Sequence, residues 1–367
     1  MNNRLRSSVS VNVSIFGVGH ALIDAACAVV IFSLPGMKAL SPDVLFAIII
    51  LYNGLAFAMQ APIGFLADFI RKPELTAVVG CLLTAGALLF GYNPVVAICL
   101  AGIGNALFHI GGGIVTINLQ PGKAAIPGLF IAPGCIGVLL GTWIGQGFVG
   151  VEWIFVVLLL ITAVGIMFLH RTPTGLPTGL AIHHSKTELI IFLLLLSVVI
   201  RSFIGLSLAY PWKTGITLPL IFILAVFFGK AFGGILADRF GWMRISIVGL
   251  LLSAPLLFFG AYEPVFAIFG IFFFNLTMPV TLVAIANLLP RYAGFSLGLT
   301  TMAIFIGLIA AVTPLKKIAY AQLWPISIII LCSAGILFIG LRLYNMSMKN
   351  PDCKVVETET TAIVEQL

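Results

Sequence analysis

The sequence predicts an all-α membrane protein with twelve transmembrane helices in two six-helix halves, a major-facilitator-like arrangement. First, 61% of the 367 residues are hydrophobic and only 8% are charged, with a mean hydropathy of +1.19. So few charges cannot cover the surface of a water-soluble domain. Second, the apolar runs are continuous over ~20 residues, as membrane-spanning helices require, and do not alternate as barrel strands do. Third, the sequence repeats itself after 170 residues.

Each apolar run is read as one helix, with boundaries set by charged, Pro- or Gly-rich breaks. The first half (1–170) is expected to hold helices at 11–34, 42–68, 75–91, 94–117, 123–148 and 152–170. The second half (188–345) is expected to hold helices at 188–210, 215–238, 243–262, 264–289, 292–314 and 322–344. Between them lies a polar linker, 171–187, which we expect to be cytoplasmic. The polar tail, 346–367, is expected to be cytoplasmic and disordered.

The repeat is clearest where the second span of each half ends. The stretch Gly64–Pro73 closes an apolar run with one acid and two bases, and Gly234–Arg244 does the same 170 residues later. Further on, Asn105 aligns with Asn275 in the same register. A duplicated six-helix unit whose copies enter the membrane from the same side places the halves about an axis along the membrane normal. Ligand sites in such folds lie near the midplane between the halves.

The net charge of +7 could indicate binding to nucleic acid, but its placement argues otherwise. Most of the 19 Lys and Arg residues fall on the side of the N-terminus when the spans above are applied. The positive-inside rule therefore places both termini in the cytoplasm and the chain in the cytoplasmic membrane. The six cysteines show no CxxC or His/Cys spacing, so no metal site or cofactor is expected. The first span has no cleavage site and is read as a retained helix.

The two charged stretches resemble the loop motif G-x-L-a-D-R-x-G-R-K of the major facilitator superfamily and its repeat in the second half. The second copy matches at Gly234, Asp238, Arg239 and Gly241. The first copy matches at Gly64, Asp68, Arg71 and Lys72, with Phe69 in place of the arginine. The resemblance covers the whole chain and implies a secondary transporter.

Three shorter stretches resemble fosmidomycin-resistance-type exporters: 19–24, 104–109 and 200–205. The match is partial, because family members often carry Pro-Glu after the histidine where this chain has Ile110 and three glycines. The substrate of that subfamily is therefore not carried over. A further stretch, with Gly137, Gly141 and Gly145, loosely resembles the Gly-Pro motif of antiporters in the superfamily. Its spacing also predicts a close helix–helix contact.

Charged side chains inside the spans are the first functional candidates, since each costs ~2.5–3.5 kcal/mol to insert. Asp24 lies ~20 Å into the first span, with His20 one turn before it on the same face. Arg201 lies at a similar depth in the seventh span. We expect Asp24 to exchange a proton, with His20 and His109 as further proton-coupling candidates. Arg201 would bind an anionic substrate group or pair with Asp24. The alternative is a static ion pair that fixes helix packing.

Four further polar residues are candidates for contact with a substrate: Lys230, its repeat equivalent Gln60, Asn105 and Asn275. Lys230 could instead extend its charge to the membrane surface. His109, which precedes three glycines, could instead be a hydrogen-bonded packing residue beside a tight helix contact. For the two charged stretches we expect conformational latches, made by Gly64, Asp68, Arg71, Lys72, Gly234, Asp238, Arg239 and Arg244. The two acids could pair with loop bases or with neighbouring helix ends in one state only. The alternative is a helix end plus a topology signal.

Together these features predict a monomeric, proton-driven transporter of a small polar or amphipathic solute, with export favoured over uptake. An uptake permease or uniporter is the alternative within the class. A non-transporting sensor or scaffold on the same fold is the alternative outside it. An enzyme is not expected, because no HExxH, GxSxG or cluster of acids at catalytic spacing lies near the spans.

Overall fold

The computed structural model describes residues 3–148, 150–169, 186–208, 210–314 and 324–349. All regular secondary structure in these ranges is helical, which confirms the predicted all-α class. Eleven helices are long and apolar enough to cross a membrane, and the shorter apolar helix α5 (Pro73–Leu89) fills the remaining predicted position. The predicted linker and tail fall almost entirely outside the described residues, as do Lys316, Lys317 and Cys353.

Residues 3–169 form the N-terminal bundle. Its helices are α1 (Asn3–Ser33), α2 (Pro35–Lys38), α3 (Pro42–Asn53), η1 (Gly54–Ala58), α4 (Gln60–Ile70), α5, α6 (Pro94–Leu119), α7 (Ala125–Ile131), α8 (Gly134–Gly147) and α9 (Glu152–Leu169). The predicted spans agree within a few residues, but α1 begins earlier and two spans are interrupted. The run 42–70 contains a π-helical turn, η1. The run 125–147 breaks at Pro133, which has no N–H to donate to the preceding turn.

Residues 187–349 form the C-terminal bundle. Its helices are α10 (Thr187–Ser207), α11 (Thr217–Phe240), α12 (Trp242–Phe259), α13 (Pro264–Asn275), α14 (Met278–Leu288), α15 (Ala293–Val312) and α17 (Trp324–Lys349). The predicted span 264–289 is divided after Asn275, next to Pro279 in the first turn of α14. Prolines restart the helix here for the same reason as in α7 and α8.

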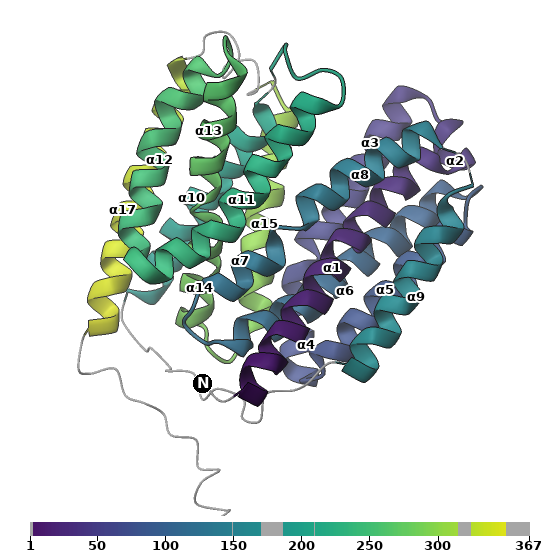
Figure 1. Ribbon diagram of the computed structural model, residues 1–367, viewed down its shortest axis with the longest axis horizontal. Helices are drawn as coiled ribbons and strands as arrows, with labels where there is room; N and C mark the ends of the chain where they lie inside the picture. The colour runs from purple at the N-terminus through teal and green to yellow at the C-terminus, as the bar shows by residue number, and fades with distance from the viewer. Residues whose placement is uncertain (1–2, 149, 170–185, 209, 315–323, 350–367) are drawn as a thin grey trace, which may run out of the picture.

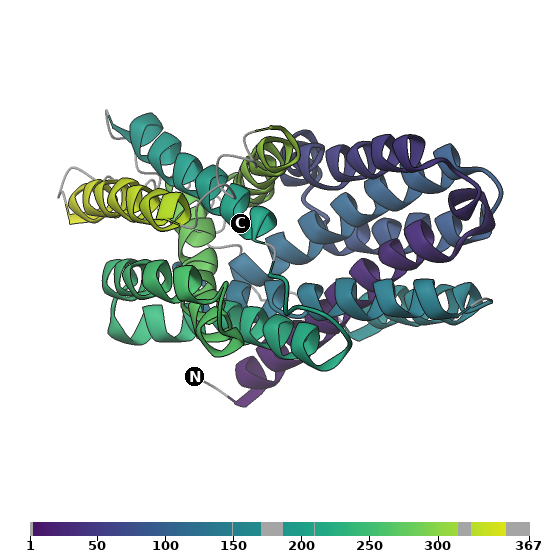
Figure 2. The same cartoon turned by 90° about the horizontal axis from the view of Figure 1, so that it is seen from above.

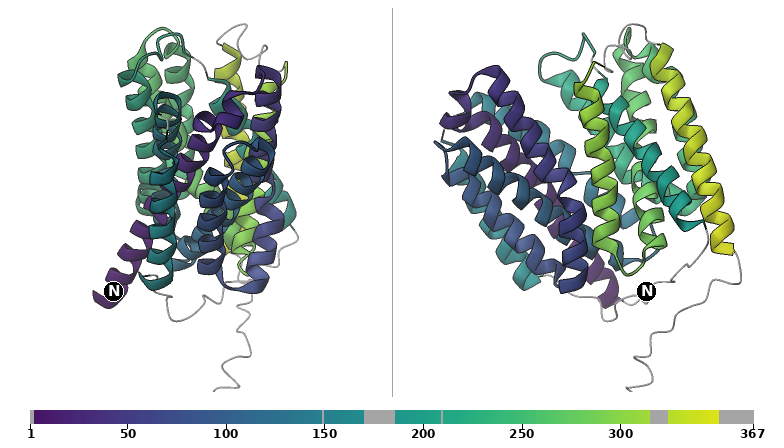
Figure 3. Two further views of the ribbon diagram at one scale, coloured as in Figure 1. Left: turned by 90° about the vertical axis from the view of Figure 1, so that its right-hand side faces the viewer. Right: turned by 180° about the vertical axis from the view of Figure 1, so that it is seen from behind.

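Each bundle has its own apolar core, and a third cluster joins them. Phe16, Phe108 and Phe130 lie in the first core, and Leu194, Leu250 and Leu337 in the second. The third cluster combines side chains of both bundles: Ala67, Ile110, Ile114 and Ile117 with Leu282, Ala286, Ala293 and Leu297. The bundles meet at the end where α1 begins and α17 ends, and they diverge toward the other end (Figures 1 and 3). Seen from above, they lie side by side (Figure 2).

The glycine spacing in α8 produces the predicted close contact. A Cβ added at Gly137 would lie 2.1 Å from the carbonyl oxygen of Ala21, and one at Gly141 would lie 2.2 Å from that of Ala25. Only hydrogen in place of a side chain allows α8 to pack this closely against α1. The contact matters for the site below, because α1 carries His20 and Asp24.

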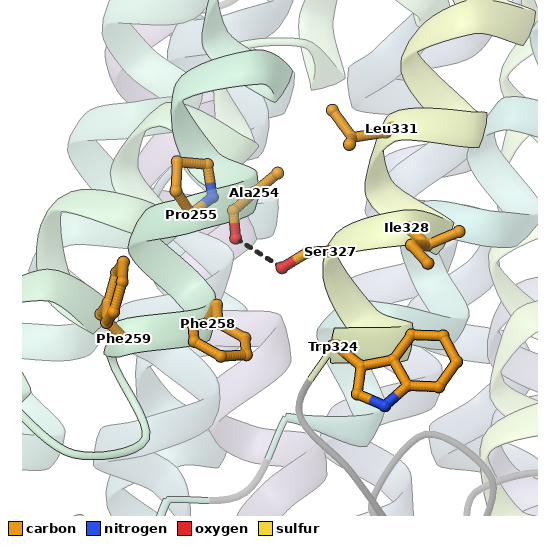
Figure 4. A pocket seen from close by; sticks show the side chains of 8 residues that line it. All are labelled: Ala254, Pro255, Phe258, Phe259, Trp324, Ser327, Ile328 and Leu331. Carbon is orange, nitrogen blue, oxygen red and sulfur yellow. Dashed lines mark hydrogen bonds between the residues drawn. The ribbon is translucent and has the colours of Figure 1, made fainter.

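An apolar groove of ≈ 370 Å³ lies on the outer side of the C-terminal bundle, between α12 and α17 (Figure 4). It is lined by Ala254, Pro255, Phe258, Phe259, Trp324, Ser327, Ile328 and Leu331. Its one hydroxyl, on Ser327, donates to the carbonyl oxygen of Ala254 at 3.0 Å. A groove with so little polar lining fits lipid chains better than a polar solute.

Candidate functional site

The site is built first on α1, where His20 and Asp24 are one helical turn apart. His20 Nε2 lies 3.3 Å from Asp24 Oδ2. His20 is buried, and the Asp24 side chain is 15% exposed. A carboxylate this well covered inside a membrane span needs partners, because isolated charge is costly in hydrocarbon.

Helix α6 supplies the remaining partners. Asn105 Nδ2 donates to Asp24 Oδ1 at 2.9 Å. His109 Nε2 lies 3.7 Å from Asp24 Oδ1 and 2.8 Å from His20 Nε2. His109 Nδ1 lies 2.8 Å from the carbonyl oxygen of Asn105, one turn earlier. The four side chains form one connected group, called here the Asp24 cluster (His20, Asp24, Asn105 and His109).

The hydrogen bonds determine where the protons of the cluster lie. A backbone carbonyl only accepts, so Nδ1 of His109 carries the proton that it donates to Asn105. In neutral His109, Nε2 is then a lone pair, and it faces Nε2 of His20 at 2.8 Å. The contact requires a proton on His20 Nε2, since two lone pairs would repel each other. The cluster therefore holds an exchangeable proton within reach of the Asp24 carboxylate.

The wall of the cluster is formed by helices α7 and α8. The Phe130 ring lies 4.8 Å from that of His20. A Cβ added at Gly134 would lie 2.3 Å from His20 Nε2 and 2.5 Å from Asp24 Oδ2. Gly134 therefore leaves open the space directly over the converging polar atoms.

Several further polar groups surround the cluster. Cys27 Sγ lies 3.8 Å from Asn105 Nδ2. Tyr52 and Cys135 are close enough to Asp24 to interact with it electrostatically. Lys230, on α11 of the other bundle, lies within electrostatic reach of His109 and Cys135. The cluster thus lies where α1, α6 and α8 face the C-terminal bundle.

Arg201 is buried in α10 and is not joined to the Asp24 cluster. Its Nη1 donates to Thr277 Oγ1 and its Nη2 to Thr281 Oγ1 at 3.1 Å. Its Nε donates to the Ser197 carbonyl oxygen at 3.3 Å. Within the described ranges no carboxylate forms an ion pair with Arg201. Asp24 has histidine and amide partners instead.

The other substrate-contact candidates are dispersed. Gln60 and Asn275 each donate their amide N–H back to their own helix, to Ala56 and Ile271. Oε1 of Gln60 is buried without a hydrogen-bond partner. The backbone of Lys230 packs against Gly128, where an added Cβ would lie 2.9 Å from the Lys230 carbonyl oxygen. Only Asn105 belongs to the Asp24 cluster.

The two acids of the charged stretches bind helix N-termini of the opposite bundle. Asp68 accepts from the backbone N–H groups of Gly294 and Phe295, each at 2.8 Å. Asp238 accepts from those of Ala124 at 3.0 Å and Ala125 at 2.9 Å. These backbone groups start α15 and α7, where free N–H groups and the helix dipole favour a carboxylate. We call these two contacts the N-terminal latch (Asp68) and the C-terminal latch (Asp238).

Glycines allow the helices of both latches to approach. A Cβ added at Gly64 would lie 2.2 Å from the Gly294 carbonyl oxygen, and one at Gly234 would lie 2.1 Å from that of Ala124. The bases of the two charged stretches take no part. Arg71, Lys72, Arg239 and Arg244 are exposed, and none forms an ion pair with either acid in the described structure.

Several residues of these sites were not singled out from the sequence. Thr277 and Thr281 resemble many other small polar residues in the spans, and no sequence signal connects them with Arg201. Gly134 stood out only through its neighbouring prolyl residue. The latch amides could have been found, because Ala124 and Ala125 are separated from Gly294 and Phe295 by the same 170 residues as Asp68 from Asp238.

No family model matches the chain, and no curated protein sequence matches it. Solved structures do. The E. coli fucose:proton symporter FucP, in a variant form, superposes with a TM-score of 0.68 over 92% of this chain and 98% of that one, at 12% identity. FucP described as a major facilitator superfamily transporter in the outward conformation gives the same score over 92% and 99%, at 15% identity. The chain has the major facilitator fold. That confirms the predicted fold class and accounts for the two-bundle arrangement of this major facilitator protein.

Proposed function

We propose that this protein is a secondary active transporter that works by alternating access, with the halves 1–170 and 188–345 rocking about a central site. The observation that carries the proposal is the Asp24 cluster, a carboxylate with two imidazoles inside the spans of a major facilitator fold. Intramembrane ionisable groups of this kind mark ion and substrate pathways. As a sensor or scaffold, the other class of function, the protein would not need a buried exchangeable proton.

Coupling to protons is the mechanism that the cluster supports best. Asp24 accepts the proton when the site faces the acidic side and releases it when the site faces the other side. His20 and His109 pass the proton or hold it, since imidazole titrates near neutral pH. The groups facing Asp24 are Asn105, Cys27, Tyr52 and Cys135, with Lys230 acting on His109 from the opposite bundle. FucP, which shares the fold, is named a proton symporter.

The substrate is proposed to be a small polar or amphipathic solute with an anionic group. Arg201 supports this, because a buried guanidinium that binds only hydroxyls and a carbonyl keeps N–H donors free for an anion. Lys230, Asn105, Asn275 and Gln60 are proposed as further contacts. We favour export, because of the resemblance to fosmidomycin-resistance-type exporters. Uptake by proton symport or uniport is the alternative.

The two latches are proposed to hold shut the end of the molecule that carries both chain ends, which would be cytoplasmic by the positive-inside rule. Both contacts cross between the bundles at that end, while the bundles diverge at the other (Figure 3). A contact present in one state only shifts the equilibrium toward that state. The protein would act as a monomer in the cytoplasmic membrane.

Transport in proteoliposomes tests the proposal. A thermal-shift screen against metabolites and antibiotics first supplies a solute, whose accumulation is then followed under an imposed pH gradient. Asp24→Asn is expected to abolish gradient-driven accumulation, while the matched substitution of an exposed acid, Asp43→Asn, leaves it within about twofold. Unchanged accumulation in Asp24→Asn would exclude Asp24 as the proton carrier. Absence of flux for every solute that binds would support the sensor alternative.

A further inference from the structure

We propose that the Asp24 cluster binds a divalent transition-metal ion of the zinc type (Zn²⁺, Co²⁺ or Ni²⁺) through His20, Asp24 and His109. One ligand atom from each of these three residues lies within 4.8 Å of the others, in the middle of the membrane spans. The inference rests on the proposed function, and it specifies that function by naming a second cation that the coupling site accepts besides the proton.

The spacing of the ligand atoms fits a tetrahedral ion. Bonds of ~2.0–2.1 Å at the tetrahedral angle place neighbouring ligand atoms ~3.3–3.4 Å apart. The two imidazole Nε2 atoms are 2.8 Å apart, and the Nε2–carboxylate distances are 3.3 and 3.7 Å. The observed distances bracket the required one, so the side chains need to shift by only a few tenths of an ångström.

The supporting hydrogen bonds prepare His109 as a ligand. Its Nδ1–H donates to the Asn105 carbonyl oxygen, which fixes the ring and turns the Nε2 lone pair toward the cluster. Metal-bound histidines in proteins are oriented by this kind of bond. Asn105 also donates to Asp24 and so fixes the carboxylate. His20 differs, because its Nδ1 is buried without a partner, so its orientation depends on Nε2 alone.

The space for an ion is kept open by Gly134. Any Cβ at this position would lie within 2.5 Å of both His20 Nε2 and Asp24 Oδ2, where an ion and its fourth ligand must fit. Two thiols, Cys27 and Cys135, interact electrostatically with Asp24 and lie around the same space. Three protein ligands with an open fourth position are typical of exchangeable rather than structural zinc sites. An exchangeable site suits a transporter.

Charge favours a cation here and sets up competition with protons. Asp24 is the one carboxylate of the cluster, and a divalent ion neutralises it at shorter distance than an imidazolium does. The opposing charge, Lys230, belongs to the other bundle. Coordination needs the lone pair on each Nε2, so the ion must displace the proton that the imidazoles share. Metal affinity is therefore expected to fall as the pH is lowered from about 7.5 to 5.5.

Co²⁺ binding to the purified, full-length, chelator-treated protein tests the inference, because tetrahedral Co²⁺ has a characteristic visible absorption. The wild type is expected to bind one ion per chain saturably, with tetrahedral absorption. His109→Gln and Asp24→Asn should each weaken binding at least about 100-fold, and the supporting substitution Asn105→Ala about tenfold. The matched histidine control, His183→Gln with His184→Gln in the linker, should leave binding unchanged.

A second pair of variants separates ligation from folding. Gly134→Ala keeps every ligand but fills the space over them, and it should weaken Co²⁺ binding at least about tenfold. Gly165→Ala adds a Cβ with no atom within 4 Å and serves as its control. Helix content and elution volume are compared throughout. Absence of tetrahedral Co²⁺ absorption in the wild type, or equal binding by His109→Gln, would overturn the inference.

The flux assay distinguishes failure of the inference from failure of the proposed function. If Asp24→Asn abolishes proton-driven flux and the wild type binds no Co²⁺, the transporter proposal stands and the metal inference is wrong. If Co²⁺ binds as expected but no flux is found, the metal site stands and the transport proposal fails. Adding Zn²⁺ during flux then shows whether the two cations compete, as the shared lone pairs require.

Discussion

Asp68 and Asp238 occupy equivalent positions in the two bundles, and each accepts two backbone N–H bonds from the start of a helix in the other bundle. Their support differs. Asp238 accepts a third bond from the Trp242 indole at 2.9 Å, and Trp242 stacks on Tyr344, with the ring centroids 5.9 Å apart. Tyr344 in turn accepts from Asn287. At the position equivalent to Trp242, the first copy has Lys72, which is exposed.

The comparison shows which part of the repeated motif is structural. Both copies keep the glycine and the acid, because these make the contact between bundles. The bases differ between copies and contact neither acid. Phe69, which replaces arginine in the first copy, is 83% exposed, so its side chain takes no part in the N-terminal latch as described here. The asymmetry seen in the structure comes from Trp242 instead.

The largest expected effect comes from removing the acids. Asp238→Ala leaves three donors without their acceptor and Asp68→Ala leaves two, so we expect about 3 kcal/mol and about 2 kcal/mol of lost latch stability. Both should raise the labelling rate of a cysteine placed at Leu297, in a cysteine-free background, because Leu297 is buried where the bundles meet. The exposed-acid substitution Asp43→Ala should not. Equal, unchanged labelling in both variants would contradict the latch proposal.

An intermediate effect is expected from the third donor alone. Trp242→Phe keeps an aromatic ring beside Tyr344 but removes the indole N–H, at a cost of about 1 kcal/mol. The Leu297→Cys labelling rate should rise by roughly fivefold. If the third donor makes the copies unequal, Trp242→Phe should bring the effect of Asp238→Ala close to that of Asp68→Ala. A persistent difference would place the asymmetry elsewhere.

The smallest effect is expected from restoring the motif residue at Phe69. Phe69→Arg adds an exposed cation near the N-terminal latch, worth at most about 1 kcal/mol and less at high salt. It should slow labelling of Leu297→Cys, meaning a shift toward the state that is open at the opposite end. Phe69→Gln is the control without charge. No slowing at low salt would show that the motif arginine has no role in this copy.

The sequence predicted the fold because twelve apolar runs and a constant register survive inspection without coordinates. It also placed His20 beside Asp24, since residues four apart on a helix share a face. The contact between His20 and His109 spans 89 residues and depends on how α1 and α6 pack, which hydropathy does not encode. For the same reason the sequence left open whether Arg201 pairs with Asp24, and gave no metal signal. The breaks at Pro133 and beside Pro279 were missed because their flanks remain apolar on both sides.

The break at Pro133 has a mechanical consequence. The first turn of α7 is bound to α11 by the C-terminal latch, while α8 is seated on α1 through Gly137 and Gly141. Any displacement of α11 that preserves the latch must be absorbed as a bend between α7 and α8. That joint is at Pro133 and Gly134, the backbone in contact with Asp24 and His20. The equivalent helix of the other bundle, α15, runs unbroken from Ala293 to Val312. Only one of the two crossing helices therefore links movement of the bundles directly to the space around the buried carboxylate.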